Sequence, residues 1–404
     1  MNTISALNPN QQQAVTADNE NLLILAGAGS GKTSVLTQRI AYLVREKNVF
    51  PSKILAVTFT NKAAKEMRKR VESLLETSTS GMWIGTFHGI AHRLLRRHAE
   101  VLGLDPDFKI LDADDQLQII KKVVQALSID DKRFPPRAIR GFINARKDEG
   151  VRSDDLHSSD QRYDYVFIKA YAAYETQRQS DKALDFSDLL LYMHELFQHH
   201  KEVRELYQER FKVILVDEFQ DTNKIQYDWL KNLVTENNSI MAVGDDDQSI
   251  YGWRGAKVEN IHKYQKDYAP VNIIKLEQNY RSTQTILDAA NAVISNNEER
   301  MGKNLWSAGD KGEPIALYEA VSEREEAAYV ATKIADKVRQ GVSPSDVAIL
   351  YRSNAQSRVL EEALISEKVS YRIYGGVRYF ERSEIKDVLA YLRLVTMSED
   401  NLAF

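Results

Sequence analysis

The sequence predicts an α/β fold built on a parallel sheet, with a helical domain inserted into the sheet domain. Three observations support this prediction. Residues 26–33 read AGAGSGKT directly after the apolar run Asn21–Leu25, which is typical of a phosphate-binding loop between a strand and a helix. Short apolar runs alternate with amphipathic helical patterns over much of the chain. Between about Gly89 and Arg210, helical periodicity dominates and strand patterns disappear.

The first α/β pattern contains five apolar runs of strand length, and amphipathic helices follow the first two of them. The predicted strands are Leu22–Ala26, Ile54–Phe59, Val213–Val216, Ile240–Gly244 and Asn272–Leu276. The predicted helices of this pattern are Lys32–Arg45 and Lys62–Leu75. Those of the inserted region are Gln116–Leu127, Arg137–Arg146, Asp164–Arg178 and Phe186–Phe197.

A second α/β pattern begins after Leu276. Its predicted strands are Ile315–Glu319 and Val347–Tyr351. Its predicted helices are Thr283–Ser295, Glu323–Arg339 and Gln356–Ser366, with a further helix near Glu384–Thr396.

Composition narrows the class of protein. The 404 residues are 43% hydrophobic, which is enough for well-packed cores in two or more domains. The net charge is −4, so any nucleic-acid surface must be a local patch. There are no cysteines, which excludes disulfides and fits a reducing compartment. No apolar run approaches membrane-spanning length, so we expect a cytoplasmic protein with no membrane partner.

The phosphate-binding loop predicts the ligand class. Its glycines let successive backbone N–H groups point inward at a phosphate. Lys32 supplies a positive charge to the β- and γ-phosphates, and Thr33 supplies a hydroxyl to Mg²⁺. Ala26 stands where such loops usually have their first glycine, which requires a negative φ there. The predicted nucleotide-binding residues of the loop are Ala26, Gly27, Ala28, Gly29, Ser30, Gly31, Lys32 and Thr33.

Carboxylates follow the apolar run at 213–216 in the sequence VILVDEFQDTN. Ligands of open α/β sheets bind at the carboxyl ends of the strands. One carboxylate of the Asp217–Glu218 pair can hold Mg²⁺ through water, and the other can act as a general base towards the attacking water. In VGDDDQSIYGWRGA, residues 243–256, Gln248 is a neutral group that can touch both water and the γ-phosphate.

Aromatic and basic residues near the strand ends suggest a nucleic-acid surface. Tyr251 and Trp253 lie close to Gln248 and can stack on bases, although a lone Trp in such a loop is more often part of a core. Two segments, residues 56–70 and 86–98, each pass from a strand-like end into a helix with a run of basic residues, although such a run is normally just a solvated helix face. The residues of these two segments that are able to contact DNA are Phe59, Lys62, His88 and Arg93.

The order of these motifs resembles one family, the UvrD/Rep/PcrA group of superfamily 1 DNA helicases, and within it the UvrD (DNA helicase II) branch. The resemblance runs through AGAGSGKT, AVTFTNKAAKEMR, GTFHGIAHRLLR, LVDEFQDTN, VGDDDQSIYGWRGA, LEQNYRST, AILYRSNAQSRVLEEAL and YRIYGGVRYFER. It implies two RecA-like motor domains, 1A and 2A, with helical insertions 1B and 2B. It also implies ATP-dependent 3′→5′ movement on single-stranded DNA and unwinding of 3′-tailed duplexes, with partners in mismatch and nucleotide excision repair.

The resemblance also assigns roles to individual residues. It implies that Gln11 reads adenine, that Tyr280 stacks on adenine, and that Arg281 is an arginine finger, whereas Arg281 alone could equally be a surface residue. It implies that Asp217 holds the metal and that Glu218 acts on the hydrolytic water, whereas Lys32 and Gln248 keep the roles given above. The DNA-contacting positions that it implies are Phe59, His88, Phe186, Tyr251, Trp253, Arg352 and Asn354.

The family's later motifs, a TLHxAKG-type segment and the final Arg-bearing helix of 2A, are absent. The predicted division is therefore 1A at 1–87 and 211–277, 1B at 88–210, the first part of 2A at 278–376 and the start of 2B at 377–404. The isolated chain is expected to be deficient in unwinding. The alternatives are a DNA-dependent ATPase fragment, a nucleotide- and DNA-binding module without helicase activity, and the motor part of an AddA/RecB-type helicase–nuclease.

Overall fold

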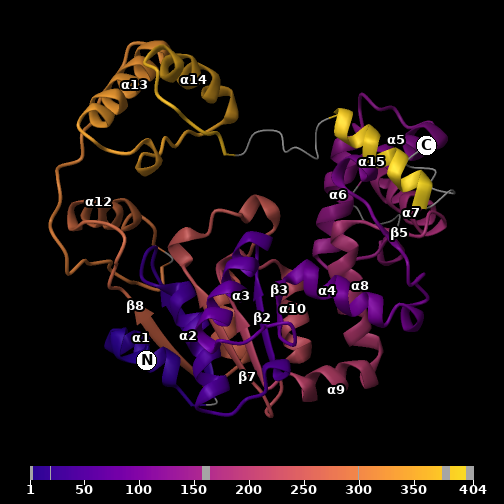
Figure 1. Cartoon of the computed structure of the whole chain (residues 1–404). Helices are drawn as coiled ribbons and strands as arrows, with labels where there is room; N and C mark the ends of the chain where they lie inside the picture. The colour runs from indigo at the N-terminus through magenta and orange to yellow at the C-terminus, as the bar shows by residue number, and fades with distance from the viewer. Residues whose placement is uncertain (1–2, 19, 157–163, 299, 375–382, 397–404) are drawn as a thin grey trace. The chain divides into compact units, whose positions relative to one another are not determined.

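A computed structural model describes residues 3–18, 20–156, 164–298, 300–374 and 383–396 (Figure 1). The chain forms two compact units, residues 1–313 and residues 314–404. Residues 278–313, which the sequence analysis assigned to 2A, lie in the first unit. The boundaries predicted for 1A, 1B, 2A and 2B remain predictions, and residues 377–382 and 397–404 of the predicted 2B lie outside the described residues.

The first unit is built on a six-stranded sheet whose paired strands all run parallel, in the order β3-β2-β6-β7-β1-β8. The strands are β1 (Asn21–Ala26), β2 (Ile54–Thr58), β3 (Trp83–Thr86), β6 (Val213–Val216), β7 (Ser239–Gly244) and β8 (Val271–Leu276). All five strands predicted for this pattern are confirmed, and β3 adds a sixth at the edge. Parallel pairing of β6, β7 and β1 brings their carboxyl ends to one edge of the sheet.

Successive side chains of each strand alternate between two apolar layers. Leu22 and Ile24 pack with α1, α2 and α3, whereas Leu23 and Leu25 pack with α4, α8, α10 and α11 on the opposite face. The helices are α1 (Pro9–Thr16), α2 (Lys32–Arg45), α3 (Asn61–Leu75), α4 (Phe87–Arg97), α8 (Phe186–His199), α9 (Lys201–Arg210), α10 (Lys224–Leu233), α11 (Glu259–Asp267) and α12 (Gln284–Ile294). This two-sided burial explains why the strands are almost continuously apolar.

The region between β3 and β6 is mainly helical, as predicted. Its further helices are α5 (Ala113–Ala126), α6 (Pro136–Asp148) and α7 (Tyr165–Ser180). The expectation that strands disappear here is wrong in one detail, because β4 (Lys109–Ile110) pairs in parallel with β5 (Ala183–Leu184). Two-residue strands leave no periodicity in the sequence, so only tertiary contact reveals them.

The second unit contains α13 (Glu323–Arg339), α14 (Ser357–Ser366) and α15 (Ser383–Thr396). The first two pack together through Ala331, Ile334 and Leu364. The strands predicted at 315–319 and 347–351 are not formed, and Leu317 and Leu350 are 96% and 94% exposed. A strand requires a hydrogen-bonded neighbour, and in the described part of the chain neither segment pairs with one.

No helix among the described residues is long and apolar enough to cross a membrane.

Candidate functional site

The phosphate loop has the conformation that its glycines permit. β1 ends at Ala26 and α2 begins at Lys32. Gly29 and Gly31 have φ of 71° and 90°, in the left-handed region that favours glycine. Ala26 remains in the strand and is not among the positive-φ residues, so the requirement stated for alanine at this position is met. Ser30 Oγ donates to the Gly27 carbonyl at 2.8 Å and closes the loop.

Gln11 supports this loop from α1. Its buried Nε2 donates to the Ser30 carbonyl at 2.9 Å, and its Oε1 accepts from the Asn8 backbone at 3.1 Å. Asn8 Nδ2 in turn donates to the Tyr280 hydroxyl at 2.9 Å. The two residues predicted to contact adenine, Gln11 and Tyr280, are therefore linked through one asparagine. A primary amide has two donors and two acceptor lone pairs, so Gln11 keeps capacity for a ligand.

Asn279 fixes the segment after β8 against the loop, and sequence reasoning missed it. Its Nδ2 donates to the Ala28 carbonyl, and its Oδ1 accepts the backbone N–H groups of Arg281 at 2.8 Å and Ser282 at 2.7 Å. The Tyr280 N–H donates to the Gly29 carbonyl at 2.9 Å. A Cβ on Gly29 would lie 2.7 Å from Asn279 Nδ2, so this close contact requires glycine. The signal available in the sequence was an asparagine capable of a local turn directly before Tyr280.

Arg281 starts beside the phosphate loop. A Cβ on Gly29 would also lie 2.7 Å from Arg281 Cβ. The residue is exposed, and within the described part of the chain its guanidinium forms no ion pair. Its position next to Gly29 fits a cation that reaches a nucleotide phosphate.

Asp217 is held at the carboxyl end of β6. Its N–H donates to the Val57 carbonyl at 2.9 Å, and Oδ2 accepts from Thr58 Oγ1 at 3.4 Å. Its other oxygen, Oδ1, is buried without a hydrogen-bond partner among the described residues. Burial, followed by the charge of Glu218, raises the pKa of Asp217 to about 7. An unsatisfied carboxylate oxygen is a suitable ligand atom for Mg²⁺, so this residue fits the predicted metal role.

Glu218 adopts a left-handed backbone conformation, with φ of 51° and ψ of 45°, which is uncommon outside glycine and typical of strained functional positions. Its Oε2 lies 3.5 Å from Lys32 Nζ and accepts from Gln220 Nε2 at 2.9 Å. Gln220 Oε1 accepts the Asp245 N–H at 2.9 Å, so this buried amide joins the ends of β6 and β7. Gln220 is a second residue that sequence reasoning missed.

Gln248 lies on the turn that follows β7. Its Nε2 donates to Asp245 Oδ2, and the same oxygen is 4.0 Å from Lys32 Nζ. The structure therefore brings the predicted γ-phosphate sensor, the lysine of the loop and Glu218 to one edge of the sheet. These groups could hold a triphosphate and position a water next to a carboxylate.

Four of the predicted DNA-contacting residues form two aromatic pairs in the first unit. The rings of His88 and Phe186 lie 4.6 Å apart, and Phe186 is 58% exposed. Burial lowers the pKa of His88 to about 4, so it is neutral at pH 7. Tyr251 and Trp253 have ring centroids 6.3 Å apart, and Trp253 is 75% exposed, against the interpretation of Trp253 as a core residue.

Phe186 begins α8, and a buried ionic network fixes that helix end. Lys147 Nζ lies 2.7 Å from Asp185 Oδ2 and 2.8 Å from Asp188 Oδ1. The Tyr174 hydroxyl donates to the same Asp185 oxygen at 2.7 Å. Because these groups are buried and mutually paired, they fix the backbone on both sides of Phe186 and so position its exposed ring.

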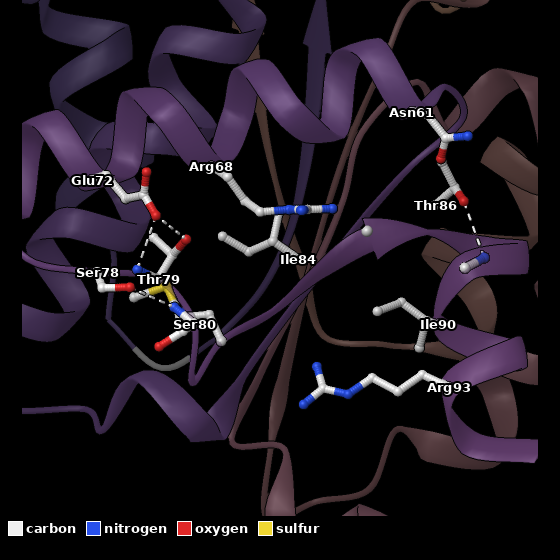
Figure 2. A pocket seen from close by; sticks show the side chains of 13 residues that line it. Asn61, Arg68, Glu72, Ser78, Thr79, Ser80, Ile84, Thr86, Ile90 and Arg93 are labelled. Atoms are coloured by element: carbon white, nitrogen blue, oxygen red, sulfur yellow. Dashed lines mark hydrogen bonds between the residues drawn. The ribbon is translucent and has the colours of Figure 1, made fainter. Parts of the chain in front are cut away.

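A polar pocket of about 380 Å³ lies along the edge strand β3, between α3 and α4 (Figure 2). Asn61 and Thr86 line one end of it, close in sequence to Phe59, Lys62 and His88. Arg68 and Arg93 line its two walls, from α3 and α4 respectively. The Arg93 guanidinium lies 3.9 Å from the centre of the Trp83 ring, which holds this predicted phosphate contact in place.

The remaining two predicted DNA contacts, Arg352 and Asn354, lie in the second unit. Asn354 begins a short 3-10 turn, Asn354–Gln356, and the Arg352 N–H donates to Gln356 Oε1 at 2.9 Å. Their roles remain predictions.

Two family regions match the chain. The UvrD/REP helicase N-terminal domain matches residues 7–269, and the UvrD-like helicase C-terminal domain matches residues 274–404. Such domains have a RecA-like fold, which agrees with the parallel sheet and confirms the predicted fold class.

Relatives named as helicases match almost the whole chain. It is 52% identical over 405 residues to DNA helicase II of Haemophilus influenzae and 52% identical over 401 residues to DNA helicase II of Escherichia coli. It is 48% identical over 403 residues to the ATP-dependent DNA helicase PcrA of Bacillus subtilis. Each alignment covers 99% of this chain but 56%, 56% and 54% of the respective relative, so the chain spans a little over half of their length. Because the N-terminal domain match alone covers more than half of the chain, the chain belongs to the UvrD/Rep helicase family.

Proposed function

We propose that this chain is the ATP-binding part of a 3′→5′ DNA helicase that couples ATP hydrolysis to movement on single-stranded DNA. The observation that carries the proposal is the meeting of Lys32, Glu218 and Asp245 at the carboxyl ends of three adjacent parallel strands. Relatives that match 99% of the chain are named as DNA helicases. The substrates proposed are ATP, single-stranded DNA and 3′-tailed duplex DNA, in the cytoplasm, with mismatch and nucleotide excision repair proteins as partners.

In the proposed reaction, water attacks the γ-phosphorus and the bond to the β,γ-bridging oxygen breaks, which gives ADP and phosphate. Glu218 accepts the proton of the attacking water. Lys32 and the loop N–H groups hold the phosphates, and Gln248 orients the water and the γ-phosphate. Arg281 places a positive charge where negative charge develops.

Thr33 and Asp217 are proposed to hold Mg²⁺, which supplies charge neutralisation to the phosphate oxygens when bound. The unpartnered Oδ1 of Asp217 supports this assignment. Gln11 and Tyr280, joined through Asn8, are proposed to bind the adenine by amide hydrogen bonds and ring stacking.

For DNA, we propose that exposed aromatic rings stack on bases while basic side chains neutralise phosphates. Trp253 and Phe186 are the exposed rings, and Lys62 and Arg93 supply charge. The acidic net charge of the chain fits a mode in which few phosphate contacts act together with stacking.

The proposal is tested by ATP turnover with and without single-stranded DNA, followed by an unwinding assay on a 3′-tailed duplex. Turnover that DNA stimulates supports it, and unwinding of a 3′-tailed but not a 5′-tailed duplex would show in addition that this part of the family's length is sufficient for strand separation. DNA-stimulated turnover without unwinding is the result expected for the isolated chain, which then acts as a DNA-dependent ATPase fragment. Absence of ATP binding refutes the proposal.

A further inference from the structure

Three consecutive carboxylates follow β7, and a lysine lies among them. Lys303 Nζ lies 2.7 Å from Asp245 Oδ1 and 2.9 Å from Asp247 Oδ2, and it also contacts Asp246 Oδ1. Arg300 forms a two-pronged pair with Asp247, at 2.7 and 2.9 Å. Lys303 and Asp245 are 4% and 2% exposed, so these charges are shielded from water and interact strongly.

The lysine comes from residues 300–306, here called the anchor segment, which touches the nucleotide site at two further points. Leu305 packs against the phosphate loop so closely that a Cβ on Gly27 would lie 2.2 Å from Leu305 Cδ2. The Trp306 carbonyl accepts the Asn279 N–H at 2.8 Å. Lys303 is thus presented to the acidic turn by a segment that is itself fixed to the phosphate loop and to Asn279.

Asp245 is shared between two lysines. Its Oδ1 faces Lys303 at 2.7 Å, whereas its Oδ2 is 4.0 Å from Lys32 and accepts from the Gln248 amide. A carboxylate next to the lysine of the phosphate loop competes with phosphate for that cation. The shorter distance to Lys303 means that most of the Asp245 charge is balanced from the side away from Lys32.

We propose that Lys303 is a positioning residue of the nucleotide site: it neutralises the Asp245–Asp247 turn and so limits the competition of Asp245 with the phosphates of ATP for Lys32. The inference rests on the proposed function and goes beyond it, because it assigns a role to a side chain in the anchor segment. Without Lys303, the cations that remain next to the turn among the described residues are Arg300, which pairs with Asp247, and Lys32, which lies 4.0 Å from Asp245. Asp245 then binds Lys32 more tightly, and the turn repels an anionic nucleotide.

The test compares ATP binding and steady-state turnover of wild type with Lys303→Met. One uncompensated charge beside a polyanion is expected to weaken ATP binding roughly tenfold. KM for ATP should rise by a similar factor while kcat changes by less than about threefold, because Glu218 and Arg281 are untouched. The defect should shrink at high salt, which screens the repulsion. A matched control is Lys231→Met, which removes an exposed lysine that lies 3.1 Å from a single carboxylate, that of Asp267.

Charge rescue separates this role from a merely structural one. Lys303→Met/Asp246→Asn restores the wild-type net charge of the cluster without restoring the lysine, and it should regain ATP affinity to within about threefold of wild type. Wild-type ATP affinity in Lys303→Met, or a folded double variant as weak as Lys303→Met, overturns the inference.

A second variant keeps the test decisive if Lys303→Met does not fold. Asp246→Asn retains Lys303 and removes one carboxylate, so it should tighten ATP binding by roughly threefold. Unchanged or weaker binding in this variant also overturns the inference. Failure of wild type itself to bind ATP instead refutes the proposed function and is recognised before any variant is compared.

Discussion

Lys32 Nζ lies 3.5 Å from Glu218 Oε2, so the cation of the phosphate loop and the proposed general base form an ion pair. The two residues have opposite proposed tasks, one binding phosphate and the other accepting a proton from water. The hydrogen bond from Gln220 to the same Glu218 oxygen fixes the carboxylate from the other side. Substitutions of the two partners should therefore separate binding from hydrolysis.

Glu218→Gln should retain ATP binding and abolish turnover. Glutamine keeps the size of the side chain and an oxygen that can accept from Gln220, but it cannot take a proton from water at neutral pH. Lys32→Ala should instead lose nucleotide binding, because it removes the main positive charge of the loop. Equilibrium binding and steady-state hydrolysis distinguish the two defects. Hydrolysis at the wild-type rate by Glu218→Gln would show that another group activates the water.

Arg281→Ala should lower turnover by at least roughly 10², since arginine fingers contribute about 10³–10⁵ in rate. DNA affinity should stay nearly unchanged, and the fold should persist because Asn279 binds the backbone N–H of residue 281 rather than its side chain. The measurement is kcat at saturating ATP together with single-stranded DNA affinity. A change in kcat below about threefold would return Arg281 to the alternative of a surface residue.

Asn279→Ala should weaken ATP binding and destabilise the protein by about 1–3 kcal/mol, because it removes three hydrogen bonds to partly buried backbone groups. Asn279→Asp distinguishes the acceptor function of the amide from its donor function. It keeps an acceptor for the N–H groups of Arg281 and Ser282 but loses the donor to the Ala28 carbonyl. Thermal unfolding and nucleotide affinity of both variants test this. Wild-type behaviour of the alanine variant would mean that the segment after β8 does not support the loop.

The sequence predicted those parts of the site that depend on local patterns. A buried strand followed by glycines and a lysine, or by two carboxylates, requires only a short stretch of chain, and each such stretch lies where it was expected. Asn279 and Lys303 were not predicted because their roles arise from contacts between distant parts of the sequence. Asn279 binds Ala28, 251 positions away, and Lys303 binds Asp246 and Asp245, 57 and 58 positions away. The strands predicted at 315–319 and 347–351 were wrong for a related reason, since a strand also depends on contacts that a local pattern does not reveal. Their apolar patterns are local, but a strand exists only with a hydrogen-bonded neighbour.

Trp253→Ala should weaken single-stranded DNA binding roughly 10-fold with little change in its salt dependence, since stacking contributes about 1–3 kcal/mol per base. Arg93→Ala or Lys62→Ala should instead flatten the salt dependence, because each removes a phosphate contact and the counterion release that accompanies it. The measurement is DNA affinity across a series of salt concentrations. Trp253 is 75% exposed, so its loss should leave the fold intact. Unaltered affinity in Trp253→Ala would exclude this ring from the DNA surface.

Asp148, the last residue of α6, should make stability depend on pH in a direction opposite to that of most carboxylates. Burial is the main cause that raises its pKa to about 7, with Asp185 and Glu149 adding to the effect, whereas the hydrogen bond from Ser187 and the charge of Lys147 oppose it. The ordinary pKa of an aspartate is 3.8, so between about pH 4 and pH 7 the native state binds more protons at this site than the unfolded state does. The contribution of Asp148 to the free energy of unfolding therefore falls as pH rises through that window and is constant above it.

Asp148→Asn removes this dependence, because asparagine does not ionise. Relative to wild type, the variant should gain stability progressively from pH 5 to pH 8, which thermal unfolding at several pH values measures. Comparing the two proteins at each pH cancels the contribution of every other titrating group. Asp310→Asn, at an exposed carboxylate, controls for the loss of one negative charge. A difference between Asp148→Asn and wild type that stays constant from pH 5 to pH 8 would mean that Asp148 is already ionised in the native state at pH 5. The ionic network of Lys147, Asp185 and Asp188 would then tolerate the negative charge of Asp148 next to it, in spite of the burial of that side chain.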